Sequence, residues 1–237
     1  KLDDRLSGAC THLAYGMIRL PDGKMKSREG TVVDANALLA QMHDLAYAEG
    51  KVRVDEGRAH SIDISDDDIH ARAEVIGLAA LKYYLLKFSP RTSFEYNPKE
   101  SIDFQGQTGP YCLFNYARTR SIVEKANQDA AKPVLPWSHA LAACLVSETE
   151  CKLVRQLYDW PAVLEGAIDG LDPSRICEFV YGLSRSFANF FTDKEGHPIL
   201  TCADAKRRSA RVHLADAVGH CIATGLSVVG IDVLEEM

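Results

Sequence analysis

Apolar residues recur at helical spacing in the last third of this chain, and this pattern constrains the fold more than any other feature. Successive members lie four, three, four and three residues apart, which places them on one face of an α-helix. The five residues are Ile176, Val180, Leu183, Phe187 and Phe190. Asp172 and Pro173 precede them, as is typical of a helix start. So apolar a stripe predicts a helix buried in a core rather than a binding face.

Comparable signals predict that most of the remaining chain is helical. The expected helix starts are Asp34, Ser65, Pro110, Ser147 and Asp204. The first of these helices is expected to end at Gly50, and the one that starts at Pro110 is expected to end at about Lys125. The polar stretches 51–64 and 127–136 lack a helical period and are predicted to be linkers.

Three consecutive aspartates follow Ser65, and two interpretations of them are open. Asp66, Asp67 and Asp68 would occupy the first turn of the helix, where negative charge suits the helix dipole. The alternative is a metal site built from their carboxylates. Their position favours the electrostatics of a helix start, and we predict no metal ligand in the chain.

A small α/β part is predicted at the start of the chain. Residues 12–20 and 31–33 have the composition of strands, and the Pro-Asp-Gly turn at 21–23 lies between them. We therefore predict a mainly α fold with two parts. Residues 1–64 form the α/β part, and residues 65–237 form a helical bundle with a candidate sub-boundary at 127–136.

Composition excludes several classes of protein. The seven cysteines are an odd number and include no C-x-x-C pair, which argues against a disulfide framework and a structural zinc site. No apolar run reaches the length of a membrane span, so no membrane partner is expected. The net charge is −6, and no third of the chain is net basic when it is divided at 64/65 and 126/127. Nonspecific binding to DNA or RNA is therefore disfavoured, and any RNA contact is expected to be local.

The last predicted helix carries four cations near its start: Lys206, Arg207, Arg208 and Arg211. Such a run could touch RNA phosphates. The simpler interpretation, which we adopt, is a charged helix face in contact with water.

Residues 23–30, Gly-Lys-Met-Lys-Ser-Arg-Glu-Gly, are the most informative segment of the chain for function. Two glycines bracket three cations and a serine. The segment could be a hairpin tip that hangs in water, or a loop that closes over a polyphosphate. It is not a P-loop, because the required order of glycine, lysine and serine or threonine is absent.

Three segments taken together resemble arginyl-tRNA synthetase, a class I aminoacyl-tRNA synthetase. Residues 23–30 are similar to the KMSKS loop of that family. Residues 106–111, Gly-Gln-Thr-Gly-Pro-Tyr, followed by Tyr116, Ala117 and Arg118, resemble the start of its anticodon-binding domain. Residues 225–231, with the ending Glu235, Glu236 and Met237, resemble its C-terminus. The order and spacing of the three segments make the resemblance specific.

The resemblance implies an ATP-dependent ligase that joins arginine to its tRNA. ATP would be contacted by Lys24, Met25, Lys26, Ser27 and Arg28. Lys24 and Lys26 would act in catalysis by stabilising charge on the leaving pyrophosphate, together with Mg²⁺ held mainly by phosphate oxygens. The segment departs from the usual KMSKS order, because Lys26 and Ser27 are exchanged.

The resemblance also implies that the helical part binds the anticodon of arginine tRNA. The residues that match the presented positions are Gln105, Gln107, Tyr111, Arg118 and Phe191. Phe191 stands where relatives often carry a tyrosine that stacks on a base, and Met237 is expected to help shape the site. A packing role remains the alternative for Tyr111 and Phe191.

No HIGH-like motif and no nucleotide-binding sheet are found in the sequence, and the resemblance places both upstream. We therefore expect a C-terminal fragment of a cytoplasmic, monomeric enzyme that uses ATP, Mg²⁺ and arginine. The fragment alone is expected to be inactive. Its first part would be a remnant of the class I catalytic domain, and its second the anticodon-binding domain. The alternative is a freestanding helical module that binds RNA or protein and has no catalytic activity.

Overall fold

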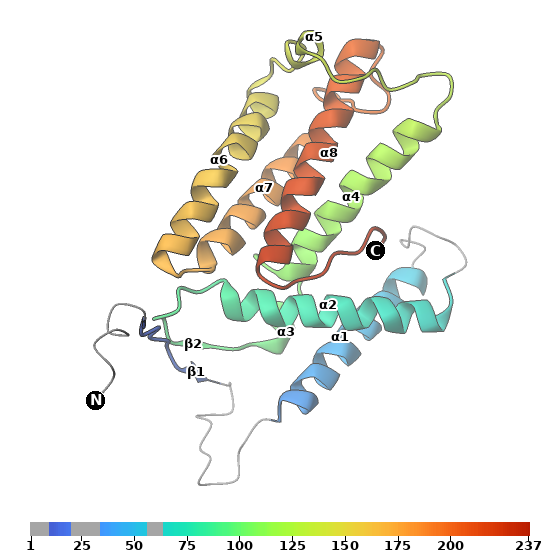
Figure 1. Cartoon of the computed structure of the whole chain (residues 1–237). Coiled ribbons are helices and arrows are strands. Elements are labelled where there is room, and N and C mark those ends of the chain that lie inside the picture. Colours follow the sequence, from blue (N-terminus) through green and yellow to red (C-terminus); the bar gives the residue numbers. More distant parts are fainter. Residues whose placement is uncertain (1–9, 20–33, 56–63) are drawn as a thin grey trace, which may run out of the picture.

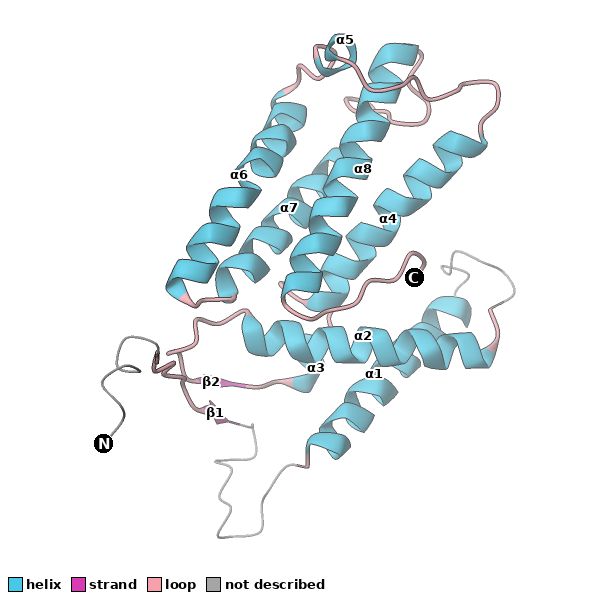
Figure 2. Cartoon of the chain, in the orientation of Figure 1, coloured by secondary structure: helices cyan, strands magenta, loops and turns pink. Residues whose placement is uncertain are grey.

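Helices make up most of the chain in the computed structural model, which describes residues 10–19, 34–55 and 64–237 (Figure 2). The helices are α1 (Ala35–Asp55), α2 (Asp66–Leu86), α3 (Pro98–Ser101), α4 (Gly109–Gln128), α5 (His139–Ala142), α6 (Glu148–Gly170), α7 (Ser174–Thr192) and α8 (Ala205–Val228). The strands are β1 (Ile18–Arg19) and β2 (Phe94–Glu95). The predicted mainly α class is confirmed. The division of the chain at 64/65 stays a prediction.

Helices α4, α6, α7 and α8 stand side by side and form a bundle (Figure 1). In this bundle α4 packs on α7 and α8, and α6 packs on the same two helices. Helix α2 runs across the lower ends of the bundle and carries α1 on its other side. The C-terminal tail leaves α8, passes between the bundle and α2, and ends beside α4.

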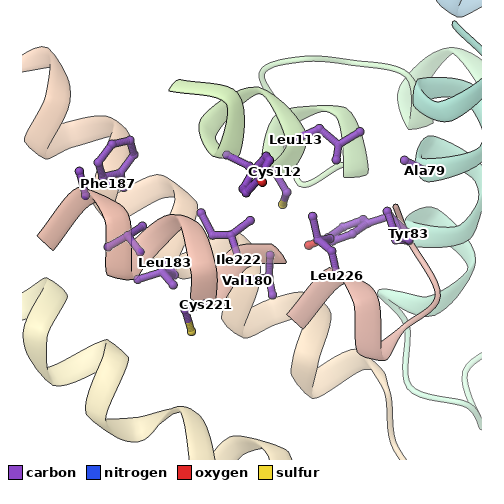
Figure 3. Close-up of a cluster of buried hydrophobic side chains, with 14 of the residues drawn as sticks. Ala79, Tyr83, Cys112, Leu113, Val180, Leu183, Phe187, Cys221, Ile222 and Leu226 are labelled. Carbon is purple, nitrogen blue, oxygen red and sulfur yellow. The ribbon is translucent and has the colours of Figure 1, made fainter. Parts of the chain in front are cut away.

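One apolar core joins α2 to the bundle. The five-residue stripe of α7 is confirmed as buried, since Ile176 is 4% exposed and the other four residues are 0% exposed. Figure 3 shows Ala79 and Tyr83 of α2 in the same cluster as side chains from α4, α7 and α8. The hydroxyl of the fully buried Tyr83 donates a hydrogen bond to the carbonyl of Cys177 at 2.7 Å. Helix α2 is therefore fixed to the bundle by apolar burial and by a satisfied polar contact.

The start of α2 is a capping box. The Ser65 hydroxyl accepts from the backbone N–H of Asp68, and the Asp68 carboxylate accepts from the backbone N–H of Ser65. The Asp66 carboxylate also accepts hydrogen bonds from Lys51 and from the Tyr47 hydroxyl, both at 2.8 Å, and these bonds lower its pKa. The helix-start interpretation of the three aspartates is confirmed.

Helix α1 does not end at Gly50, as the sequence suggested, but continues to Asp55. The glycine serves close packing instead, because a Cβ at Gly50 would lie 3.2 Å from the Cγ2 of Ile69 in α2. The additional turn is held by contacts distant in the sequence, including the one between Arg53 and Phe104. Residues 51–55 of the predicted linker are therefore helical, and residues 56–63 lie outside the described residues.

Of the predicted strand 12–20, the structure describes residues 12–19, and among these Ile18 and Arg19 are β-structure. Strand β1 pairs in parallel with β2, with Ile18 opposite Phe94 and Arg19 opposite Glu95. The hairpin partner expected at 31–33 lies outside the described residues. A parallel partner so distant in the sequence leaves no local signal, which is why the pairing was not predicted.

The solvated-face interpretation of the basic run is wrong for two of its four cations. Arg208 is 2% exposed and Arg211 is 3% exposed. Arg208 donates to the carbonyl of Lys132 at 2.6 Å, and Arg211 forms a buried ion pair with Glu150 at 2.7 Å. These two cations serve the fold, because each donates hydrogen bonds to acceptors that burial would otherwise leave without a partner.

The seven cysteines are all free thiols, and burial raises the pKa of Cys112 and of Cys177 to about 12. In the described ranges, no helix is both long and apolar enough to cross a bilayer.

The contact between α1 and α2 depends on Gly77. A Cβ there would lie 2.8 Å from the carbonyl carbon of Met42, so the two backbones would have to separate. We expect Gly77→Ala to lower the free energy of unfolding by about 1–3 kcal/mol. At Gly182 in α7 the nearest atom is 3.8 Å away, so Gly182→Ala should be neutral or stabilising by about 0.5–1 kcal/mol. Urea unfolding of both variants measures the contrast, and equal effects would contradict the close-packing interpretation.

The ion pair between Glu150 and Arg211 should make stability depend on pH. Burial would raise the pKa of Glu150, but hydrogen bonds from the Ser147 backbone and from Arg211 outweigh it, so the pKa lies below its ordinary value. The contribution is therefore fully present above the unfolded-state pKa and is lost as the pH falls through the folded-state value. We expect Glu150→Gln to cost about 3 kcal/mol at neutral pH.

The difference between the parent and Glu150→Gln should stay constant from neutral pH down to about 4.3, the ordinary pKa of glutamate, and should shrink as the pH is lowered further, to about 3. Glu148→Gln is the matched control, because Glu148 is exposed in the same helical turn. Urea unfolding across this pH range measures both. A difference that stayed constant with pH would rule out the pair as its origin.

Candidate nucleic-acid interface

A cleft of about 280 Å³ opens between α4, the end of α7 and the C-terminal tail. Its lining combines rings, cations, carboxylates and apolar side chains. The lining residues are Phe114, Ala117, Arg118, Ser121, Ile122, Lys125, Phe191, Leu200, Glu235, Glu236 and Met237. Two of the predicted tRNA-binding residues, Arg118 and Phe191, are therefore brought together by the fold, and Met237 lies with them.

The guanidinium of Arg118 lies beside two phenyl rings. Its Cζ atom is 4.1 Å from the ring centre of Phe114 and 5.2 Å from that of Phe191. Its Nη1 donates to the Oδ1 of Asn115 at 3.3 Å, and the Asn115 amide in turn donates to the Tyr111 carbonyl at 2.9 Å. Burial lowers the pKa of Arg118 below its ordinary value, yet a guanidinium stays charged at any physiological pH. The cleft thus contains an oriented cation in a partly apolar setting.

Phe191 serves both packing and the cleft. Its ring stacks on the fully buried Phe187, with centres 6.3 Å apart and planes 28° apart. Phe191 itself is only half-buried and lines the cleft. The two interpretations of Phe191 are therefore compatible, because the ring contacts the core and also lines the cleft.

The C-terminal tail is held in place by contacts with α8 and α2. Gly230 has a positive φ of 72°, which turns the chain, and the N–H of Ile231 donates to the Leu226 carbonyl at 2.9 Å. Lys82 donates to the Gly230 carbonyl, and Arg72 forms an ion pair with Glu236 at 3.0 Å. These contacts bring Met237 into the cleft lining.

The other three predicted residues lie outside the cleft lining. Tyr111 packs against Tyr181 with ring centres 5.4 Å apart, and burial raises its pKa. Hydrogen bonds link it to Arg118 through Asn115. Gln105 is exposed on the loop before α4, and the Gln107 carbonyl accepts from Lys87 at 3.4 Å. For these residues a role in tRNA binding stays a prediction.

Sequence reasoning missed three lining residues of α4 that a helical repeat reveals. Phe114, Ser121 and Lys125 stand four before, three after and seven after Arg118. These are the spacings that share one helix face. The predicted ATP-contacting segment, with Lys24, Met25, Lys26, Ser27 and Arg28, lies outside the described residues.

The arrangement is suited to holding a flat, electron-rich group. Rings and a guanidinium plane stack on nucleobases without a strict sequence requirement, and Lys125 adds a cation at the rim. The carboxylates of Glu235 and Glu236 can accept hydrogen bonds from the amino groups of a base. Single-stranded RNA with an unstacked base has the chemistry that this cleft can bind.

A larger cavity, of about 570 Å³, lies between α5, α6 and α8. Its lining is mainly apolar and includes Trp137, Leu145 and Val154. None of the predicted site residues lines it, and its few polar groups are largely engaged, since His213 contacts the Leu135 carbonyl at 2.8 Å and Asp216 pairs with Arg120 at 2.8 Å. We therefore assign the candidate site to the smaller cleft.

Residues 112–237 match the family model of the DALR anticodon binding domain. Over 95% of its length, the chain is 38% identical to the arginine–tRNA ligase of Flavobacterium psychrophilum, covering 35% of that protein. It is also 38% identical to the arginine–tRNA ligase of Treponema denticola over the same share, covering 37% of that protein. The chain thus spans about a third of the length of these relatives. The matches confirm the resemblance drawn from the three motifs.

The fold also matches a solved structure. The arginyl-tRNA synthetase of Thermus thermophilus superimposes with a TM-score of 0.78 over 95% of this chain and 35% of the other, at 24% sequence identity. The segment that matches the family model contains Arg118, Phe191 and Met237. Gln105, Gln107 and Tyr111 precede that segment.

The half-buried position of Phe191 can be tested by measuring the free energy of unfolding. We expect Phe187→Ala to cost about 3–5 kcal/mol, because it empties a fully buried position. Phe191→Ala should cost clearly less, about 1–2 kcal/mol, because its side chain is only half-buried. Urea unfolding of the two variants gives the comparison. A cost for Phe191→Ala that equalled that of Phe187→Ala would make Phe191 a core residue only.

Proposed function

The chain belongs to the DALR anticodon-binding domain family, and we propose that it binds the anticodon of arginine tRNA as part of an arginine–tRNA ligase. The observation that carries the proposal is the Arg118 guanidinium, which lies beside the rings of Phe114 and Phe191 in an open cleft. This site falls within the segment that matches the family.

Binding at this cleft would rest on stacking and local hydrogen bonds. The chain has a net charge of −6, so long-range attraction to phosphate contributes little. An anticodon base that unstacks from its loop would instead lie against Arg118 and Phe191. Stacking of this kind contributes about 1–3 kcal/mol per base.

We extend the proposal to the ligase reaction through the segment 23–30. Lys24 and Lys26 would stabilise the charge that develops as pyrophosphate leaves, and Met25, Ser27 and Arg28 would complete the contact with ATP. Mg²⁺ bound to the phosphates would supply further charge neutralisation. Within the described ranges, no group of three or more histidine, cysteine, aspartate or glutamate side chains is placed to hold a metal ion.

As part of the same proposal, the ligase acts in the cytoplasm and is a monomer. A freestanding module that binds RNA or protein would account for the cleft but not for the segment 23–30. The similarity to two arginine–tRNA ligases extends over 95% of the chain and therefore favours the ligase.

Binding of an arginine tRNA transcript to the chain tests the central proposal. At fixed ionic strength, Arg118→Ala should weaken binding about tenfold or more, which corresponds to the loss of one stacked base contact. Arg118→Lys should recover only a small part of the loss, because a lysine keeps the charge but not the stacking plane. Arg185→Ala is the matched control, because Arg185 is exposed on α7 and does not line the cleft.

The measurement is a titration followed by fluorescence anisotropy, with thermal unfolding to verify that each variant is folded. Equal weakening by the variants of Arg118 and Arg185 would indicate general charge attraction. No weakening by a folded Arg118→Ala variant would exclude the cleft as the anticodon site.

A further inference from the structure

We propose that Arg53, at the end of α1, is a positioning residue that orients Arg118 in the cleft. The inference rests on the proposed function, because it deepens the description of the same site. Arg53 stands 65 residues before Arg118 in the sequence and does not line the cleft itself. It acts through a row of alternating rings and guanidinium groups.

This row, the arginine–phenylalanine ladder, consists of Phe104, Arg53, Phe114, Arg118 and Phe191. The Cζ of Arg53 lies 3.7 Å from the ring centre of Phe104 and 5.6 Å from that of Phe114. The second guanidinium then lies 4.1 Å from Phe114 and 5.2 Å from Phe191. Phe114 is thus contacted by both arginines, and both contacts depend on the orientation of its ring. A change at Arg53 should therefore reach Arg118 through one shared ring.

Arg53 is itself held in a defined orientation. Its Nε donates to the Oε1 of Glu49, one turn earlier, at 3.1 Å, and the Arg53 side chain is 24% exposed. Phe104 also packs against the main core. A fixed guanidinium that is largely removed from water makes a stronger cation–π contact than an exposed one. The turn of α1 beyond Gly50 brings Arg53 to this place.

Met237 provides a second link between Arg53 and the cleft. A cavity of about 50 Å³ is lined by Arg53, Phe104 and Met237. Met237 also lines the 280 Å³ cleft that contains Arg118. Met237 therefore borders both cavities.

The simpler alternative is that Arg53 only stabilises the end of α1. In that case its loss would lower stability but leave Arg118 where it is. The orientation of Arg118 must therefore be read directly, in the chain without RNA. The Nε–H signal of Arg118 in a ¹⁵N-labelled sample is suited to this, because the guanidinium lies beside two rings whose ring currents shift it.

The experiment compares Arg53→Lys, Phe104→Leu and Phe104→Tyr with the parent, and Arg118→Lys assigns the signal by its loss. Arg53→Lys keeps the positive charge but removes the stacking plane. We expect the Arg118 signal to move in Arg53→Lys and in Phe104→Leu and to return toward the parent position in Phe104→Tyr. Arg185→Ala, on the exposed side of α7, should leave it unchanged.

Affinity for the arginine tRNA transcript provides the second readout. Arg53→Lys should weaken binding about three- to tenfold, in the range of a cation–π contact. In an Arg118→Ala background the same change should weaken binding by less than about 1.5-fold, because the residue that it positions is gone.

If the Arg118 signal in folded Arg53→Lys and in folded Phe104→Leu stays at its position in the parent, the inference is overturned, whatever the affinities. Losses of affinity that simply multiply in the double variant would overturn it as well. If the parent chain does not bind the transcript, the proposed function fails. The NMR comparison then still decides whether Arg53 positions Arg118.

Discussion

The junction between α2 and the bundle determines where everything else in the site lies. Gly109, the first residue of α4, lies so close to α2 that a Cβ there would overlap the carbonyl oxygen of Ala79. Tyr83, one turn along α2, donates a hydrogen bond to the carbonyl of Cys177 in α7. Because a helix is a rigid rod, fixing the first residue of α4 also fixes the direction of its later side chains. The cleft face of α4, with Arg118 at its centre, depends on this one close contact.

A second constraint concerns the charge of the arginines in this acidic chain. Two of the four cations at the start of α8 are buried, and one of them, Arg211, pairs with Glu150 and donates to the Pro198 carbonyl at 2.8 Å. Those bonds hold the segment that carries Leu200, which is one wall of the cleft. Arg118 is different, because it donates to the neutral side-chain amide of Asn115. Its charge lies in the cleft together with the carboxylates of Glu235 and Glu236, a local arrangement that suits recognition of a single base better than attraction to a phosphate backbone.

Features that depend on neighbours in the sequence could be predicted, and features that depend on distant contacts could not. The stripe of α7 and the cap at Ser65 each need only a few adjacent residues, and both were predicted from the sequence. The continuation of α1 past Gly50, the parallel partner of β1 and the burial of Arg211 each depend on residues far along the chain. The same holds for the site. Arg118 and Phe191 were found through motifs, and Phe114 has a helical-spacing signal, but nothing local to Arg53 marks it as a neighbour of the cleft.

The ladder bears on where the functional unit begins. The segment that matches the anticodon-binding family starts at residue 112, and the boundary predicted from the sequence stands at 64/65. Arg53 precedes both positions, and Phe104 precedes the first, yet both side chains belong to the row that ends at Phe191. The bundle alone would retain the lining of the cleft but would lose the contacts that orient Phe114. Since α1 packs on α2 and α2 packs on α4, the support of the cleft extends through three successive helices. Its geometry is therefore a property of α1, α2 and the bundle together, and the first of these follows directly on the segment that is similar to the KMSKS loop.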